Sequence, residues 1–316
     1  MEQQQPMFPP FLGLLLGAVF VSTAAVLVKL ASAPAEVVAF YRLFLAVVLM
    51  TPFSIPYFKE LRAFESRAWI YLLLSGLFLA LHFVLWFESL NYTSVASSVV
   101  LVTLQPLFTF IGAYMLFGER IKMKALAGGL LAICGSVMIF WGDFRIGGEA
   151  VWGNALALLA AAMVSGYWLC GQHLRQRLSI MTYTYVVYGT GALFILLYVA
   201  LTGGALFSYP ARDWWLFVAL ALFPTLLGHS IFNWAVKWVG ASIISVTVLF
   251  EPIGASLLAY LILGETLSSA QIAGGLIILS GIYLFIRNHH SQAQRVQADH
   301  EQQPVSVPDQ KHSTNA

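Results

Sequence analysis

Long apolar runs separated by short polar segments occupy nearly all of the 316-residue chain. Each run is long enough to cross the hydrocarbon core of a bilayer as a helix, which takes about 20 residues. Ten such runs lie at about 11–30, 37–54, 68–88, 95–117, 125–141, 152–171, 183–201, 214–236, 241–263 and 271–286. Because backbone in lipid must satisfy its own hydrogen bonds, the pattern predicts an all-α membrane protein with ten transmembrane helices.

The composition supports this interpretation and excludes several classes of protein. Hydrophobic residues make up 59% of the chain and charged residues only 9%, whereas an ordinary soluble domain carries about 25% charged residues. A soluble enzyme, a nucleic-acid-binding protein and a disordered protein are therefore excluded. The two cysteines lie in apolar runs and predict neither a disulfide nor a metal site. The sequence has no GxSxG, HExxH or glycine-rich phosphate-binding motif, so we expect no enzyme activity and no cofactor.

Lysine and arginine are distributed unequally between the two sets of alternating loops. If the N-terminus is cytoplasmic, twelve of these bases lie in cytoplasmic segments and three, Lys29, Arg145 and Arg212, in external ones. Cytoplasmic loops of membrane proteins are enriched in such residues. Both termini are therefore predicted to lie in the cytoplasm, with the chain spanning the inner membrane.

The end of each half of the chain carries the same sequence pattern. Pro106 and the pair Gly118-Glu119 recur 146 positions later as Pro252 and Gly264-Glu265. A shared apolar bias would not place Pro, Gly and Glu in register, so the chain is predicted to hold two five-helix repeats. The expected organisation is a cytoplasmic N-terminus at 1–10, a first repeat at 11–141, a connecting loop at 142–150, a second repeat at 151–287 and a disordered cytoplasmic tail at 288–316.

An odd number of helices in each repeat inverts the second repeat relative to the first. Three bases follow Glu119, at positions 120, 122 and 124, whereas Glu265 is followed by Thr266, Leu267 and Ser268 with no base. Inverted repeats are typical of secondary transporters, in which the two halves rock around a central site to give alternating access. A static bundle built by duplication is the structural alternative.

The motifs of the second repeat make the chain resemble a known family. Asn233-Trp234-Ala235, Glu251-Pro252 and Gly264-Glu265-Thr266-Leu267 look like the EamA domains of the drug/metabolite transporter superfamily. The resemblance covers about residues 11–287. It implies ten helices around a cavity lined mainly by the first, third, fourth, sixth, eighth and ninth, and export of a small metabolite, often an amino acid. Ser22-Thr23 stands where the family usually has Trp-Gly, and Gln105-Pro106 where Glu-Pro is usual.

Ionisable groups deep in a membrane span are candidate functional residues, because each costs several kcal/mol unless it faces protein or water. Glu251 lies about ten residues into the ninth run, directly before Pro252, whose missing N–H should loosen the preceding turn. A protonatable Glu251 would allow a proton-coupled cycle, and a permanent hydrogen bond to a neighbouring helix is the structural alternative. The other candidates for substrate binding or coupling are Lys29, His82, Trp86, Gln105, Trp168, His229 and Asn233.

Arg42 lies inside the second run and matches an arginine that is common in the family. Because the resemblance does not place that helix around the cavity, a structural contact with helix-end carbonyls or an acid is favoured over bidentate binding of a substrate carboxylate. Lys29 shares a helix face with Ser22 and is the better candidate for contact with an anionic group.

Glycine and glutamate near the repeat ends have structural interpretations. Glu119 and Glu265 each follow a span and are expected to cap the next helix. Two pairs of glycines stand seven positions apart on one helix face: Gly128 with Gly135, and Gly274 with Gly281. Such stripes let helices approach closely, so the fifth and tenth helices are predicted to pack together or to support a homodimer.

The sequence therefore predicts a transporter that exports small metabolites, amino acids or similar amphipathic compounds, across the inner membrane. Its expected partners are the substrate, the lipid bilayer and, in a coupled cycle, protons; no nucleic-acid partner is expected. Without a nucleotide-binding segment, the driving force would be an ion gradient or the gradient of the substrate itself. The alternatives are a sugar or nucleotide-conjugate importer or exchanger of the same superfamily, and a non-transporting scaffold or sensor.

Overall fold

The structure is a computed structural model that describes residues 9–61, 66–93, 95–141, 148–264 and 269–302, which form helices and turns without a β-strand. The first half contains α1 (Pro10–Val21), α2 (Ala24–Leu30), α3 (Ala35–Ser54), η1 (Ile55–Tyr57), α4 (Phe58–Leu61), α5 (Ser66–Tyr92), α6 (Val95–Val102), α7 (Gln105–Phe117) and α8 (Met123–Trp141). The second half contains α9 (Glu149–Leu174), α10 (Ile180–Thr202), α11 (Ala211–Leu220), η2 (Ala221–His229), α12 (Ser230–Val248), α13 (Glu251–Leu258), η3 (Ala259–Leu263) and α14 (Ser269–Gln302).

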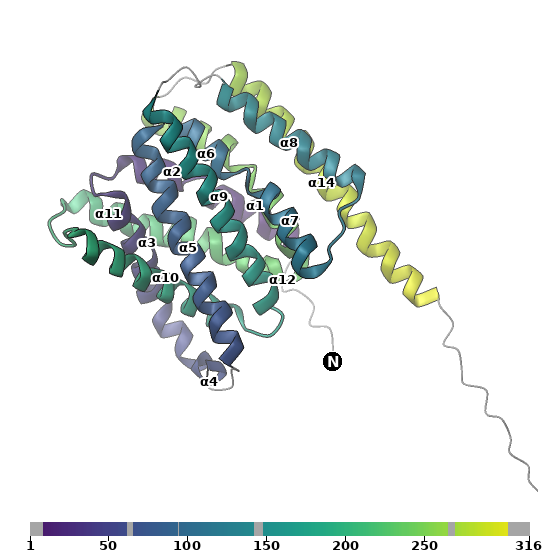
Figure 1. The fold of residues 1–316 in the computed structure, drawn as a ribbon, viewed down its shortest axis with the longest axis horizontal. Helices are drawn as coiled ribbons and strands as arrows, with labels where there is room; N and C mark the ends of the chain where they lie inside the picture. Colours follow the sequence, from purple (N-terminus) through teal and green to yellow (C-terminus); the bar gives the residue numbers. More distant parts are fainter. Residues whose placement is uncertain (1–8, 62–65, 94, 142–147, 265–268, 303–316) are drawn as a thin grey trace, which may run out of the picture.

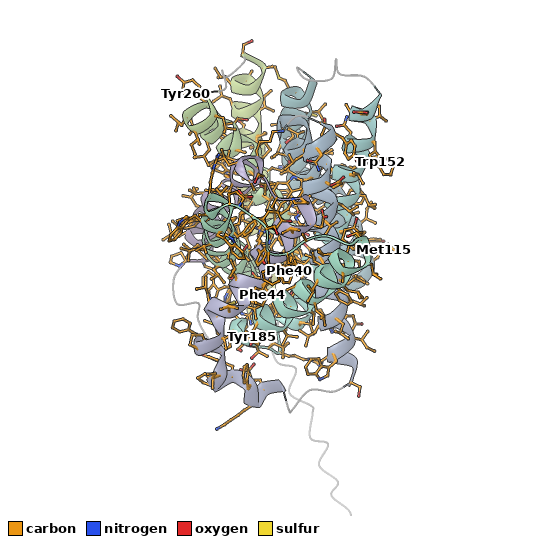
Figure 2. All side chains as sticks on the ribbon, turned by 90° about the vertical axis from the view of Figure 1, so that its left-hand side faces the viewer. Phe40, Phe44, Met115, Trp152, Tyr185 and Tyr260 are labelled. Carbon is orange, nitrogen blue, oxygen red and sulfur yellow. The ribbon has the colours of Figure 1, made fainter. Side chains whose placement is uncertain are left out.

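The outer surface of the bundle is apolar. Seven helical segments of the described chain are long and apolar enough to cross a membrane, and three shorter apolar helices accompany them. Met115, Trp152 and Tyr260 lie on the outside of the bundle (Figure 2), with exposed fractions of 75%, 59% and 49%. A large apolar surface of this kind is unfavourable in water and is stable in the hydrocarbon core of a bilayer. The protein is therefore a multi-pass membrane protein.

Three of the predicted runs are broken near their middle. The breaks lie at residues 22–23, 103–104 and 249–250. Pro106 and Pro252 occupy the first turns of α7 and α13, directly after two of these breaks. Proline lacks the N–H that would continue a preceding helix but fits the first turn of a new one. The loosened turn that the sequence predicts before Pro252 is thus present, and Pro106 has the same effect in the first repeat.

Gly240 divides α12 into two helices. Its φ of 79° is in the left-handed region, so the chain turns sharply at this residue. Gln172 Oε1 accepts a hydrogen bond of 2.7 Å from the backbone N–H of Ala241 and so caps the helix that follows. The part of α12 before Gly240 continues η2, whereas the part after it leads into α13.

The glycine turns that close the two repeats have the same backbone geometry. Gly118 and Gly264 end α7 and η3 with φ values of 65° and 71°, as the sequence match between the repeats predicts. Glu119 lies four residues before Met123, the first residue of α8, and its capping of that helix stays a prediction. Glu265 lies outside the described residues.

Helices α8 and α14 lie side by side at one edge of the bundle (Figure 1). A Cβ added to Gly281 would lie 2.4 Å from the backbone N of Ala132, and one added to Gly135 would lie 2.6 Å from the carbonyl O of Gly274. A Cβ added to Gly128 would lie 2.5 Å from the backbone N of Phe285. The glycine stripes therefore hold these two helices of the same chain together; a homodimer stays a prediction.

Helix α14 extends beyond the bundle to Gln302 (Figure 1). The expectation of a tail disordered from Asn288 is corrected for residues 288–302, which are helical. This segment contains neither Gly nor Pro before Pro304, and extending an existing helix avoids the unfavourable nucleation step. Residues 303–316 lie outside the described part of the chain.

The two halves of the chain interleave. Helix α5 of the first half packs against α9 and α10 of the second, α3 packs against α10, and α1 packs against α12. Helix α10 approaches both α3 and α5 closely, since a Cβ on Gly191 would lie 2.9 Å from Leu43 Cδ1 of α3 and 3.3 Å from the Gly76 carbonyl O of α5. The interior of the bundle is therefore formed by helices of both halves.

Candidate functional site

A narrow cavity lies among helices of both halves. The lining residues come from α1, α2, α3, α5, α6, α7, α9, η2, α12 and α13. Its polar and aromatic lining residues are Arg42, His82, Trp86, Gln105, Trp168, His229, Phe232 and Glu251.

The two helices that begin after breaks, α7 and α13, each contribute their first residue to the cavity wall. Gln105 is the first residue of α7, Glu251 is the first residue of α13, and the two positions correspond in the repeats. A helix N-terminus carries unpaired N–H groups and a partial positive charge. The breaks thus place one amide and one carboxyl side chain at equivalent points of the cavity wall.

Gln105 and Trp168 form a fixed part of the wall. The indole Nε1–H of Trp168 donates a hydrogen bond of 2.9 Å to Gln105 Oε1, and Ser165 Oγ donates one of 2.9 Å to the Gln105 carbonyl O. The Trp168 ring stacks on His229, with centroids 5.5 Å apart and planes at 14°. These contacts orient a flat aromatic surface toward the cavity.

His82 and Trp86 stand one helical turn apart on α5. His82 Nδ1 lies 3.0 Å from the Ala160 carbonyl O; because a carbonyl only accepts, Nδ1 carries the proton. The His82 ring stacks on Trp86 at 5.7 Å. The indole Nε1 of Trp86 is buried and has no hydrogen-bond partner in the protein.

Arg42 lines the cavity, although the resemblance places the second helix away from it. The guanidinium Nε donates a hydrogen bond of 2.7 Å to Thr225 Oγ1, and the Cζ atom lies 4.0 Å from the centre of the Phe83 ring. Thr225 was not among the expected residues. It lies in the π-helix η2 after Pro224, and a proline inside the eighth run is the signal that could have indicated an irregular helix there.

Arg42 and Glu251 bring a basic and an acidic side chain to the same cavity. Both side chains are buried, with exposed fractions of 0% and 6%. They are not hydrogen-bonded, because Nη1 and Nη2 of Arg42 have no partner in the protein. The cavity thus contains one cationic and one acidic group that are free to bind a third molecule.

Two predicted site residues do not line the cavity. Lys29 is exposed near the end of α2. Asn233 is buried one turn beyond His229, where its amide donates to the hydroxyl of Tyr167 and lies 3.4 Å from that of Tyr188. Asn233 shares a helix face with His229 but lies one turn farther along the helix, where its neighbours are Tyr167 and Tyr188 instead of the cavity.

Comparison with known proteins identifies the chain's family. A model of the EamA-like transporter family matches residues 9–141 and 151–287. The protein belongs to this family. The two matches coincide with the two predicted repeats to within two residues at their start, and the resemblance to the drug/metabolite transporter superfamily is confirmed.

Relatives of this EamA protein are transporters. It is 24% identical to an uncharacterized transporter of Archaeoglobus fulgidus over 86% of this chain and 94% of the relative. It is 23% identical to a riboflavin transporter of Fusobacterium nucleatum (61% and 66% covered) and 25% identical to a probable terminal-alkyne amino-acid exporter of Streptantibioticus cattleyicolor (60% and 63%). A protein of known crystal structure shares the fold, with a TM-score of 0.71 at 18% identity over 87% of this chain and 96% of the other.

Proposed function

We propose that this EamA-family protein is a secondary transporter that exports small amphipathic metabolites, amino acids or similar compounds, by alternating access. The cavity carries the proposal, because both halves of the chain enclose it and buried polar groups lie beside three helix breaks. Broken helices with polar groups at the break form the substrate sites of transporters built from inverted repeats. The relative described as an amino-acid exporter supports substrates of this type.

Ten transmembrane helices with both termini in the cytoplasm are part of the proposal. The 38-residue segment Ala211–Val248 is one apolar stretch by composition, but Gly240 divides it. Its second part and the helices that follow then form a ninth span over about residues 241–263. The short apolar helices Met123–Met138 and Ile272–Asn288 are the fifth and tenth spans, which completes two inverted five-helix repeats.

Alternating access requires contacts that close the cavity at each end. In the proposed orientation, Ser32 and Asp213 meet at the external end: Ser32 donates from its backbone N, at 3.1 and 3.2 Å, and from its Oγ, at 2.7 Å. At the cytoplasmic end Arg175 Nε donates 2.9 Å to the Asn233 carbonyl O. Burial lowers the pKa of Arg175 to about 10, so it remains a cation at neutral pH.

Glu251 is the proposed coupling residue, because it is the buried acid that lines the cavity. We expect Glu251→Gln to abolish the dependence of transport on an imposed proton gradient in proteoliposomes, since the amide cannot exchange a proton. Glu149→Gln is the matched control, because Glu149 is exposed at the start of α9. Unchanged, still proton-driven transport by the Glu251 variant would remove Glu251 from the mechanism.

The direction of transport needs a separate experiment. The riboflavin transporter among the relatives supports a second substrate class, flat heterocyclic compounds, which the aromatic cavity wall would also fit; uptake is the alternative direction. Flux measured in parallel in right-side-out and inverted vesicles distinguishes the two. Export predicts accumulation in inverted vesicles and little in right-side-out ones, and the reverse result would favour uptake.

A further inference from the structure

Arg42 is held in one orientation while its two terminal nitrogens have no partner in the protein. Thr225 Oγ1 accepts from Nε at 2.7 Å, and the Phe83 ring lies 4.0 Å from Cζ. The side chain has an exposed fraction of 0%, and Nη1 and Nη2 are both buried. An arginine that served only to join helices would be expected to donate these N–H groups to carbonyls or carboxylates, because leaving them unpaired in the interior is unfavourable.

Two further buried nitrogen atoms beside the same cavity also lack a partner. Trp86 Nε1 is a donor only, and His229 Nδ1 is a donor or an acceptor according to its tautomer. Trp86 comes from α5, His229 from η2 and Arg42 from α3. Unsatisfied groups on three helices that share one cavity indicate that a bound molecule completes their hydrogen bonds.

We infer that Arg42 and Trp86 form a carboxylate subsite, and that the ligand also carries a cationic group that faces Glu251. This inference rests on the proposed function and names the charge pattern of its substrate. Two parallel N–H groups of a guanidinium match the two oxygens of a carboxylate. The Nε contact with Thr225 leaves that pair free and fixes its direction, so Thr225 is a positioning residue.

Glu251 makes a zwitterion the favoured ligand. A simple anion would leave the acceptor oxygens of Glu251 without a donor. A simple cation would leave the Arg42 guanidinium unpaired. Since charges in a poorly solvated cavity are stabilised only by partners, a ligand with one carboxylate and one ammonium group satisfies both side chains. Trp168 and His229 then offer a stacked aromatic wall to the rest of the molecule.

Binding of three indole compounds to the purified full-length protein tests the inference. Tryptophan carries both charges, tryptamine lacks the carboxylate, and indole-3-propionate lacks the ammonium group. We expect wild-type protein to bind tryptophan about tenfold or more tightly than either analogue, because each lost contact is a hydrogen bond to a charged group. Isothermal titration calorimetry in detergent gives the three affinities.

Variants assign the effect to the named atoms. Arg42→Lys keeps the charge but loses the paired N–H groups, and Trp86→Phe removes the indole N–H but keeps a ring. Both substitutions should weaken the binding of tryptophan about tenfold and leave the binding of tryptamine unchanged. Thr225→Val should act in the same direction, and Thr225→Ser should restore binding. Trp152→Phe is the matched control, because Trp152 is exposed outside the cavity.

The outcomes separate this inference from the proposed function. Equal binding of tryptophan and tryptamine by the wild-type protein, or equal weakening of both by Arg42→Lys and Trp86→Phe, would overturn the carboxylate subsite while leaving export of another metabolite in place. Binding of none of the three compounds also overturns it. The proposed function fails separately, if the protein in proteoliposomes transports no metabolite.

Discussion

Buried polar side chains around the cavity differ in whether the protein supplies their hydrogen-bond partner. Trp168 donates to Gln105, and His82 donates to the Ala160 carbonyl. Arg42, Trp86 and His229 keep buried nitrogens without such partners. The first group is bonded within the protein and gives the cavity its shape, whereas the second group is available to a ligand.

The Trp168–Gln105 hydrogen bond provides a test at the scale of one residue pair. Gln105→Leu should lower the free energy of unfolding by about 1–3 kcal/mol, because the buried Trp168 N–H loses its acceptor. Adding Trp168→Phe removes that unsatisfied donor, so the double variant should recover part of the loss. Thermal unfolding in detergent of the wild type, the two single variants and the double variant gives the double-mutant cycle. Strictly additive effects of the two substitutions would contradict a hydrogen bond between Trp168 and Gln105.

Asp213 is a second residue whose contribution can be measured. It is buried and accepts hydrogen bonds from the backbone N and the Oγ of Ser32. Asp213→Ala should destabilise the protein by about 1.5–3 kcal/mol, the range for hydrogen bonds to charged groups. The neighbouring substitution Arg212→Ala serves as the control, because Arg212 is exposed. Equal melting temperatures for the two variants would show that the contact contributes nothing to stability.

At the scale of helices, proline and glycine have different effects. Pro106 and Pro252 start new helices and so bring Gln105 and Glu251 to the cavity. Gly128 and Gly281 instead remain inside regular helices and permit a close approach of α8 and α14. The breaks therefore create the site, and the glycine stripes support it from the edge of the bundle.

The close approach of α8 and α14 predicts a large effect of one added methyl group. Gly281→Ala would place Cβ 2.4 Å from the backbone N of Ala132, so the two helices must move apart and lose packing along their length. We expect a fall in melting temperature of several degrees or more. Gly189→Ala in α10 is the matched control, because its Cβ would meet nothing within 4 Å. Similar melting temperatures for the two variants would refute the prediction.

At the scale of the whole molecule, the two halves share their helix contacts instead of forming separate lobes. Helix α5 packs on α9 and α10, and α3 packs on α10. A rocking motion of one group of helices against the other would therefore change contacts at both ends of the cavity at once. The Ser32–Asp213 contact and the Arg175–Asn233 contact are the ones that it would break in turn.

The proposed orientation predicts which loops face the cytoplasm. In a variant without Cys134 and Cys170, a new cysteine at Lys122 or Arg177 should react with a membrane-impermeant maleimide only after the cells are permeabilised. A cysteine at Glu149 or Arg212 should react in intact cells. All four positions are exposed. Reaction of the first pair in intact cells would reverse the orientation, and an identical pattern at all four would contradict inverted repeats.

The sequence alone determined the features that depend on solvent and local backbone chemistry. Apolar runs of membrane-spanning length predict the helices, and the match of Pro106, Gly118 and Glu119 to residues 146 positions later predicts the repeats that the family comparison also recognises. The breaks before Pro106 and Pro252 follow from the missing N–H of proline. These properties need no knowledge of which helices are neighbours.

Only the tertiary structure decided which side chains meet. Glu251, His82 and Gln105 line the cavity, Lys29 and Asn233 do not, and Arg42 lies there on a helix that the family resemblance left out. The physical reason is that a side chain's direction depends on the rotation of its helix and on irregular turns such as η2, which holds Thr225 beside Arg42. Rotation is set by packing against neighbours, and an almost uniformly apolar sequence carries little record of it.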